Sequence, residues 1–162
     1  AIGKRNQIAG GIIRGDITIE DISALSGSFK PKQLGIVLEA MEEASRKHPE
    51  LTNDGWIDFA QQYVNADVST FRRQSSRIIG NIAPFHPDHL ESCISRLLQN
   101  TEHEGTVIRW SGAYALSRII LIPRYARSPL FDQLTEIADR ETESGVRNQY
   151  TAALQRAEKL RS

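Results

Sequence analysis

The sequence has 162 residues, 40% hydrophobic and 25% charged, a composition typical of a globular protein with one ordinary core. Twenty lysine and arginine residues balance 20 aspartate and glutamate residues, and this zero net charge argues against an extended nucleic-acid coat. No apolar run approaches the roughly 20 residues that a membrane-spanning helix needs, and a single cysteine, Cys93, excludes an internal disulfide.

The N-terminal residues 1–28 carry the weakest pattern of the chain. Residues 1–16 show no clear helical periodicity, and their glycines indicate flexibility or a turn. Thr18 precedes two acidic residues, as at a helix N-terminus, and Gly27 ends that short helix. Because the segment contains several isoleucines, it is apolar enough to cover one end of a larger structure. We therefore expect it to form either a cap or a tail.

The remainder of the chain, residues 31–160, shows apolar residues at helical spacing in seven segments. Pro31 and Pro129 lie at positions that suit the first turn of a helix, whereas Pro84 and Pro123 are expected to end helices. The predicted helices are 31–47, 54–65, 69–83, 87–100, 106–121, 128–141 and 145–160. No segment alternates with period two, so the sequence predicts an all-α chain of about eight helices.

A similar segment occurs three times, at spacings of 37 and then 38 residues. Each copy opens with an apolar residue and an arginine and continues with small and apolar residues at helical spacing. The copies are FRRQSSRIIGNIA from Phe71, IRWSGAYALSRII from Ile108 and VRNQYTAALQRAE from Val146. A repeat of this period indicates stacked helical units, which offer an extended surface for partners rather than a deep catalytic pocket.

The repeats predict helical hairpins in which each copy is the second helix. The predicted pairs are 54–65 with 69–83, 87–100 with 106–121, and 128–141 with 145–160, after 31–47 as the second member of an incomplete first pair. Neighbouring hairpins must stack to bury their apolar stripes, which predicts a short right-handed superhelix.

Charge alternates between successive segments from residue 54 onward. Segments 68–86 and 105–127 contain arginines and no acid. The acids gather in the intervening segments, at Asp54, Asp58, Asp67, Asp88, Glu91, Glu102, Glu104, Asp132, Glu136, Asp139, Glu141 and Glu143. If first and second helices form two layers, one layer is acidic and the other basic, and a neutral protein still presents a strongly signed face.

On these features the chain resembles the HEAT-like repeat family, an armadillo-type α-solenoid. The resemblance rests on the period, on the apolar-arginine start of each second helix and on the small-residue centre that follows it, and it covers residues 31–160. The stretch 104–116 is similar to small bacterial HEAT-like proteins with no assigned biochemistry. The resemblance implies a single domain, 1–162, of three to four stacked hairpins whose second helices line a concave face. It also implies an Asp–Arg ladder, but the acids here lie at shifted positions.

Aligning the three copies identifies a candidate binding surface. Residues four apart share a helix face, so two columns of side chains are expected to point away from the apolar stripes. The columns are Arg73, Arg77 and Asn81 and, beside them, Trp110, Tyr114 and Arg118, continued on the last helix by Asn148 and Arg156. Guanidinium groups bind carboxylates and phosphates, and aromatic rings add desolvated contact area. The alternative is a solvated face with Trp110 packed against a neighbouring helix.

The equivalent arginines that open the copies have a different expected role. Arg72, Arg109 and Arg147 are expected to pair with loop acids or helix ends between repeats, and so to be structural. Trp56 is expected in the core, and Cys93 lies on an apolar stripe as a small buried hydrophobe.

No catalytic residue, metal site or cofactor is predicted. His86 and His89 flank Pro87-Asp88 and could ligate a metal, but no third strong ligand is evident, so capping or surface roles are favoured. The polar loop 102–104 is a still weaker metal candidate. Ser111 lacks both the GxSxG elbow and a histidine–acid pair.

Two functional hypotheses follow. The first is a non-enzymatic protein-interaction or scaffold module that binds an acidic protein or peptide on the concave basic-aromatic face, with self-association through the repeat ends as a further expectation. The second is nucleic-acid binding, because HEAT-like DNA glycosylases of alkylation repair use a basic groove with tryptophans and an acid. Helices 69–83 and 106–121 contain no such acid. No secretory signal is visible, so a cytoplasmic location is expected.

Overall fold

The computed structural model describes residues 2–162 and, within them, shows ten α-helices and no strand. The helices are α1 (Ile2–Arg14), α2 (Ile19–Leu25), α3 (Pro31–Lys47), α4 (Asp54–Gln61), α5 (Ser69–Ile82), α6 (Glu91–Asn100), α7 (Thr106–Ile119), α8 (Pro123–Ala126), α9 (Leu130–Arg140) and α10 (Ser144–Glu158). Three short 3₁₀ segments lie at Ser26–Ser28, Pro49–Leu51 and Ala83–Phe85. The predicted all-α class is confirmed.

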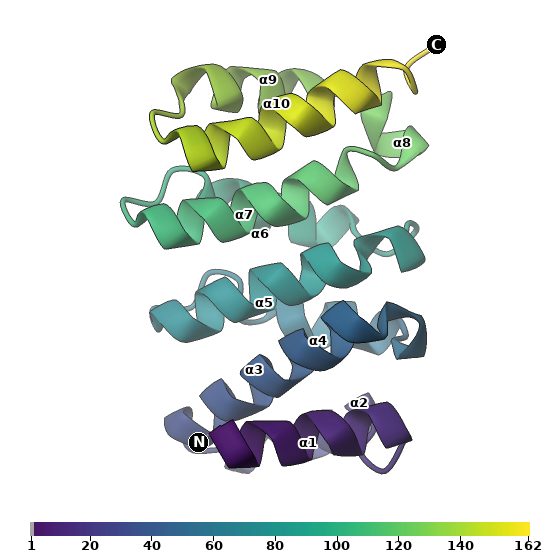
Figure 1. Cartoon of the computed structure of the whole chain (residues 1–162), viewed down its shortest axis with the longest axis vertical. Coiled ribbons are helices and arrows are strands. Elements are labelled where there is room, and N and C mark those ends of the chain that lie inside the picture. The colour runs from purple at the N-terminus through teal and green to yellow at the C-terminus, as the bar shows by residue number, and fades with distance from the viewer. Residues whose placement is uncertain (1) are drawn as a thin grey trace.

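The helices stack as hairpins along the long axis of the molecule (Figure 1). One layer consists of α1, α3, α5, α7 and α10, each in contact with the next. The partner helices α4, α6 and α9 pack on α5, α7 and α10, so the described part of the chain contains three helical hairpins. This arrangement is an α-solenoid, as predicted. We call the layer that contains α3, α5, α7 and α10 the second-helix layer.

The short helix α2 precedes α3 in the chain and packs on α4. Thr18 caps α2 by accepting a hydrogen bond from the Asp21 backbone N–H at 3.1 Å, and the Asp21 carboxylate accepts one from the Thr18 N–H at 3.0 Å. The predicted helix start at Thr18 is therefore confirmed. Pro31 occupies the first turn of α3, as expected.

The N-terminal helix α1 is the largest difference from the expected elements. Its glycines do not break it, and it packs on α3. Gly11 allows the chain to turn back onto α1 after Arg14, since a Cβ atom there would lie 2.7 Å from Cδ1 of Ile17. Ala9 and Ile12 on the same helix are buried in the core. Tertiary packing thus overrides a weak local pattern.

Two proline-containing connections also differ from expectation. Helix α6 begins at Glu91 and not at 87, because residues before it form a turn in which the His89 N–H donates to the His86 carbonyl. Helix α7 ends at Ile119, and Pro123 starts the one-turn helix α8 instead of stopping α7. Proline fits the first turn of a helix because the N–H that it lacks has no partner there.

One apolar core runs through the stack from Ile12 to Ala157. Trp56 is 4% exposed and Cys93 is fully buried, so both are core residues as expected. Burial raises the pKa of the Cys93 thiol to about 12, which keeps it protonated at neutral pH. Across residues 2–162, the helices fall short of the combined length and apolarity needed to cross a bilayer.

Candidate functional site

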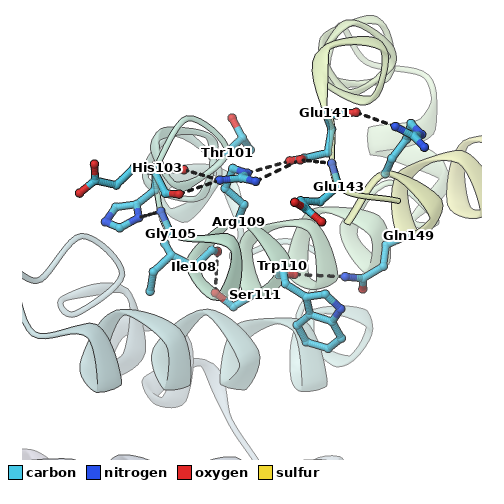
Figure 2. Close-up of polar contacts among 12 residues, drawn as sticks. Thr101, His103, Gly105, Ile108, Arg109, Trp110, Ser111, Glu141, Glu143 and Gln149 are labelled. Carbon is cyan, nitrogen blue, oxygen red and sulfur yellow. Dashed lines mark hydrogen bonds and ion pairs between the residues drawn. The ribbon is translucent and has the colours of Figure 1, made fainter. Parts of the chain in front are cut away.

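Arg109, which opens the second repeat, lies at the edge of the stack, beside the loop where its hairpin turns (Figure 2). Arg109 on α7 donates to both carboxylate oxygens of Glu141 in the next hairpin, from Nε at 3.0 Å and from Nη2 at 3.3 Å. Its Nη1 donates to the carbonyls of His103 and Glu104 in its own hairpin. One guanidinium thus bridges two successive repeats, and the Glu141 side chain is only 4% exposed.

The electrostatics of this contact favour an ionised Glu141. Burial raises the pKa of Glu141, but the hydrogen bonds from Arg109 and from the Glu143 backbone N–H outweigh burial and hold it below its ordinary value. A buried carboxylate that accepts bidentate donation is well compensated as long as its arginine is present.

The other two repeat arginines make related contacts. Arg72 on α5 donates from Nε to the side-chain oxygen of Asn100, at the end of α6 in the next hairpin, at 2.7 Å. Arg147 on α10 donates to the backbone carbonyl of Glu141 in its own hairpin at 2.9 Å. Asn100, which the sequence patterns did not single out, thus occupies the place that Glu141 holds one repeat later.

The candidate binding columns on α5 and α7 do come together, as a run of stacked side chains. The rings of Trp110 and Tyr114 are 5.6 Å apart at their centroids with an interplanar angle of 5°. The guanidinium of Arg77 lies 5.4 Å from the Trp110 ring and that of Arg118 lies 5.8 Å from the Tyr114 ring. We call these four residues the arginine–aromatic stack. Both distances lie within the roughly 6 Å range of a cation–π contact.

Asn81 does not belong to this surface, and its predicted exposure is wrong. It is 4% exposed and donates to the Glu42 side chain at 3.0 Å and to Ser45 Oγ at 3.1 Å, while it accepts from the Tyr114 hydroxyl at 2.5 Å. Burial raises the pKa of Tyr114, which therefore stays protonated and able to donate. Asn81 is buried because α3 packs against α5. Its hydrogen bond from the Tyr114 hydroxyl links it to the arginine–aromatic stack.

The backbone of α5 fixes the other end of the stack. The Arg118 Nε donates to the Gly80 carbonyl at 2.6 Å. A Cβ atom at Gly80 would lie 2.6 Å from the Tyr114 ring, so only glycine admits the ring at its present place. Both contacts tie α7 to α5, and they reduce what Arg118 can offer to a partner.

Arg73 and Arg77 differ from Arg118 because neither forms a hydrogen bond or an ion pair with another described residue. Together with Thr106, Val107 and Trp110 they line a mostly apolar hollow of about 300 Å³ between α5 and α7. Val107 is 53% exposed. Sequence analysis missed Thr106 and Val107, although their place one turn before Trp110 is the signal that could have found them.

The remaining candidate residues lie on α10. Asn148 and Arg156 are exposed, and Ala152 stands in α10 at the repeat position that Tyr114 holds in α7. Gln149 contacts the stack's own helix by donating to the Trp110 carbonyl at 3.2 Å (Figure 2). The structure therefore concentrates the aromatic and basic groups on α5 and α7, with α10 as a polar margin.

Charge on the second-helix layer is less uniform than the alternation from residue 54 suggests. Helix α3 contributes Glu39, Glu42 and Glu43 to this layer, and two of them are paired within the helix, with Arg46 and Lys47. The basic face is thus confined to α5, α7 and α10 and ends at α3, in which three acidic and three basic residues balance.

The residues considered for metal binding or catalysis make ordinary structural contacts. His86 lies 3.0 Å from the Asp54 carboxylate and 2.8 Å from Thr52 Oγ1, and His89 lies 2.8 Å from Asp58. Within residues 2–162, no group of three or more histidine, cysteine and acidic side chains is placed to hold a metal ion.

Ser111 and the loop 102–104 are also held in ordinary contacts. The buried Ser111 hydroxyl donates to the Ile108 carbonyl at 2.8 Å (Figure 2). In the loop, His103 Nδ1 accepts from the Gly105 N–H at 2.9 Å. Neither arrangement places a base beside a nucleophile.

Comparison with known proteins places the fold without assigning a family. No protein-family model and no curated protein matches the chain. The crystal structure of an engineered protein superposes with a TM-score of 0.74 at 14% identity, over 88% of this chain, which spans 63% of that protein. The complex of CpcE and CpcF of phycocyanin lyase from Nostoc sp. PCC7120 superposes with a TM-score of 0.67 at 16% identity, over 90% of this chain and 85% of the other. The second likeness is to a HEAT-like helical repeat, and at these identities it concerns the fold alone.

Proposed function

We propose that this chain is a non-enzymatic protein-interaction module that binds an acidic segment of a protein or peptide on the second-helix layer, at α5 and α7. The observation that carries the proposal is the pair Arg73 and Arg77. Their guanidinium groups lie beside an apolar hollow and form no hydrogen bond or ion pair with another described residue. A carboxylate accepted by these groups, next to an apolar side chain against Val107 and Trp110, would satisfy both features of the site.

Pre-organisation supports this assignment. Because Arg77 is stacked on Trp110, which is in turn stacked on Tyr114, its side chain has lost rotamer freedom before any partner arrives. Binding then costs less entropy than it would with a free surface arginine. A cation–π contact uses none of the guanidinium N–H groups in a hydrogen bond, so the donors of Arg77 remain available to a carboxylate.

The shape of the molecule and the likeness to a two-protein complex fit the same proposal. A stack of hairpins presents one long layer of helices, and the hollow on it is shallow and small for a metabolite site. The Nostoc structure is a complex between two proteins. Association of this chain with a second protein is part of the proposal.

The test is selection from a random-peptide display library followed by charge reversal. Selected peptides should be enriched in aspartate or glutamate next to a large apolar residue. The double variant Arg73→Glu/Arg77→Glu should lose their binding by 100-fold or more, an effect of about 3 kcal/mol for two charge-assisted contacts. Its far-ultraviolet circular dichroism should match that of the wild type.

The matched control reverses two arginines on the other layer, with Arg96→Glu/Arg140→Glu on α6 and α9, whose side chains are exposed. This variant has the same net charge change and should bind within about twofold of the wild type, since distant exposed charges are screened. Selected peptides without acids, or equal losses in both double variants, would refute the proposal.

Nucleic-acid binding is the alternative that the same arginines allow, and fluorescence anisotropy with labelled DNA and RNA tests it. The basic helices adjoin α3, whose acidic and basic residues balance, so the stack lacks the continuous basic surface that favours a phosphate backbone running along it. Binding that weakens steeply with salt and is lost in the Arg73/Arg77 double variant would replace the protein-interaction proposal with this one.

A further inference from the structure

A second hollow lies at the opposite end of the stack from α10, between α1 and the beginning of α3. It encloses about 500 Å³, within the range of small-molecule sites. Its apolar wall is formed by half-buried or buried side chains of both helices and of the segment before α3, namely Ile8, Phe29, Ile36 and Val37. Neither the repeat motif nor the proposed partner surface uses these residues.

The rim of this hollow is basic. Lys4 from α1 and Lys30 and Lys32 from the start of α3 line it together with Gln33, and no acidic residue does. None of the three lysines forms an ion pair with another residue in the described range 2–162. Three positive charges thus meet at an apolar wall without compensation from the protein.

The placement of two of these lysines opposes local stability. The first turn of α3 contains no acid, and a cation at a helix N-terminus is unfavourable because the helix dipole is positive there. The Lys30 side chain makes no capping hydrogen bond, and the Lys30 backbone N–H donates to Gln33 Oε1 at 2.8 Å. An anion seated between the lysines would offset this repulsion.

We propose that the hollow between α1 and α3 binds a small anionic amphiphile, a carboxylate on a short apolar chain. The chain would lie on Ile8, Phe29 and Ile36, and the carboxylate would lie among the ammonium groups. Ammonium groups bind such a head group as mobile point charges, which suits a ligand recognised mainly by its charge and apolar tail. A site of this kind goes beyond the proposed partner surface and does not depend on it.

The hollow has a size that favours a small ligand over a protein helix. A docked helix needs a long apolar groove that takes side chains at successive turns. Here the apolar lining belongs to one closed group of side chains at the first half of each helix. Its volume matches a single short chain and not a row of side chains.

Decanoate below its micelle-forming concentration is the probe, and the full chain labelled with ¹⁵N is titrated with it by NMR. Saturable shifts at the amides of Ile8, Phe29 and Ile36 are the expected result, and decanol, which lacks the charge, should bind roughly tenfold more weakly. No saturable shift at millimolar decanoate, or equal binding of decanol, would overturn the proposal.

Two variants separate the lysines from general charge effects. Lys4→Glu/Lys32→Glu, both at exposed positions, should weaken decanoate binding by about tenfold or more. Lys47→Glu/Lys159→Glu, with the same charge change far from the hollow, should leave it within twofold. A loss of peptide binding on Lys4/Lys32 reversal without any decanoate binding would identify the hollow as part of the protein-docking surface and overturn the small-ligand proposal. The Arg73→Glu/Arg77→Glu variant should still bind decanoate, so the two proposals can fail separately.

Discussion

Arg109, which opens a repeat, and the pair Arg73 and Arg77 on α5 have opposite surroundings. Arg109 is 16% exposed and makes four hydrogen bonds, of which the two to Glu141 join its hairpin to the next. Arg73 and Arg77, on the neighbouring helix, make none with the protein. One residue along an α-helix turns the side chain by about 100°. Between Arg72 and Arg73, that rotation moves the guanidinium from the hairpin edge, where it forms hydrogen bonds, to the open surface of the second-helix layer.

Residue type and repetition alone therefore do not identify a binding site in a solenoid. The most regular feature of the sequence, the arginine at the start of each copy, belongs to the contacts between hairpins. The irregular positions next to it, which change from Arg73 to Trp110 to Asn148, are those left facing outward. A stack needs its repeated contacts to be alike, whereas a partner surface has no such requirement.

The largest expected effect is on stability, from Arg109→Met. This change leaves the Glu141 carboxylate buried without its bidentate donor, which costs about 3–5 kcal/mol in the free energy of unfolding. Urea denaturation followed by circular dichroism measures it. Arg109→Lys, which keeps the charge and loses the fork, should fall between this variant and the wild type.

The matched comparison is Arg77→Met, which removes a stacked but otherwise unbonded guanidinium. It should cost less than about 1 kcal/mol, the worth of a partly exposed cation–π contact. Similar losses for the two variants would show that the contrast between the hairpin edge and the open layer is wrong.

The next effect tests how α5 holds the aromatic stack. Gly80→Ala places a methyl group against the Tyr114 ring, and this overpacking should cost about 1–3 kcal/mol, reduced by the better helix propensity of alanine. The free energy of unfolding measures this cost, and near-ultraviolet circular dichroism reports on the Trp110 and Tyr114 rings. In a Tyr114→Ala background the same change should lose most of its cost, and a cost that persists there would place the strain elsewhere.

Much of this architecture could be predicted from the sequence. The period of the repeats and the apolar stripes indicated the α-solenoid, and the capping pattern at Thr18 marked the start of α2. Helix α1 could not be predicted, because its glycines obscure the pattern and its stability comes from packing on α3.

The candidate site could be predicted only in part. Spacing by four placed Arg77 beside Trp110 and Tyr114 on adjacent helices, since it depends only on helix geometry. The burial of Asn81 depends on how closely α3 approaches α5, which one sequence does not state. The lysine-rimmed hollow depends likewise on a contact between α1 and α3. Local periodicity therefore fixes faces, and tertiary packing decides which members of a face remain open.

A pH series tests the contribution of the Glu141 charge at the hairpin edge. The folded-state pKa of Glu141 is lowered from 4.5, so its ionised form adds stability that is present above that value and is lost as the pH falls through the folded pKa. The difference in unfolding free energy between the wild type and Glu141→Gln should therefore shrink as the pH falls below 4.5. A difference that stays constant with pH would show that the carboxylate charge does not contribute.

The smallest expected effect lies on the first-helix side, at His89, and it runs in the opposite direction with pH. The hydrogen bond to Asp58 raises the pKa of His89 above 6.5, so the charged imidazole adds stability below 6.5 that is lost as the pH rises through the folded pKa. Because the side chain is 38% exposed, the gain over His89→Gln should stay below about 1 kcal/mol. NMR titration of the ring gives a direct reading, and Asp58→Asn should bring the midpoint down towards 6.5. A midpoint unchanged by Asp58→Asn would mean that the more distant Asp54, 3.9 Å from the other ring nitrogen, sets the titration instead.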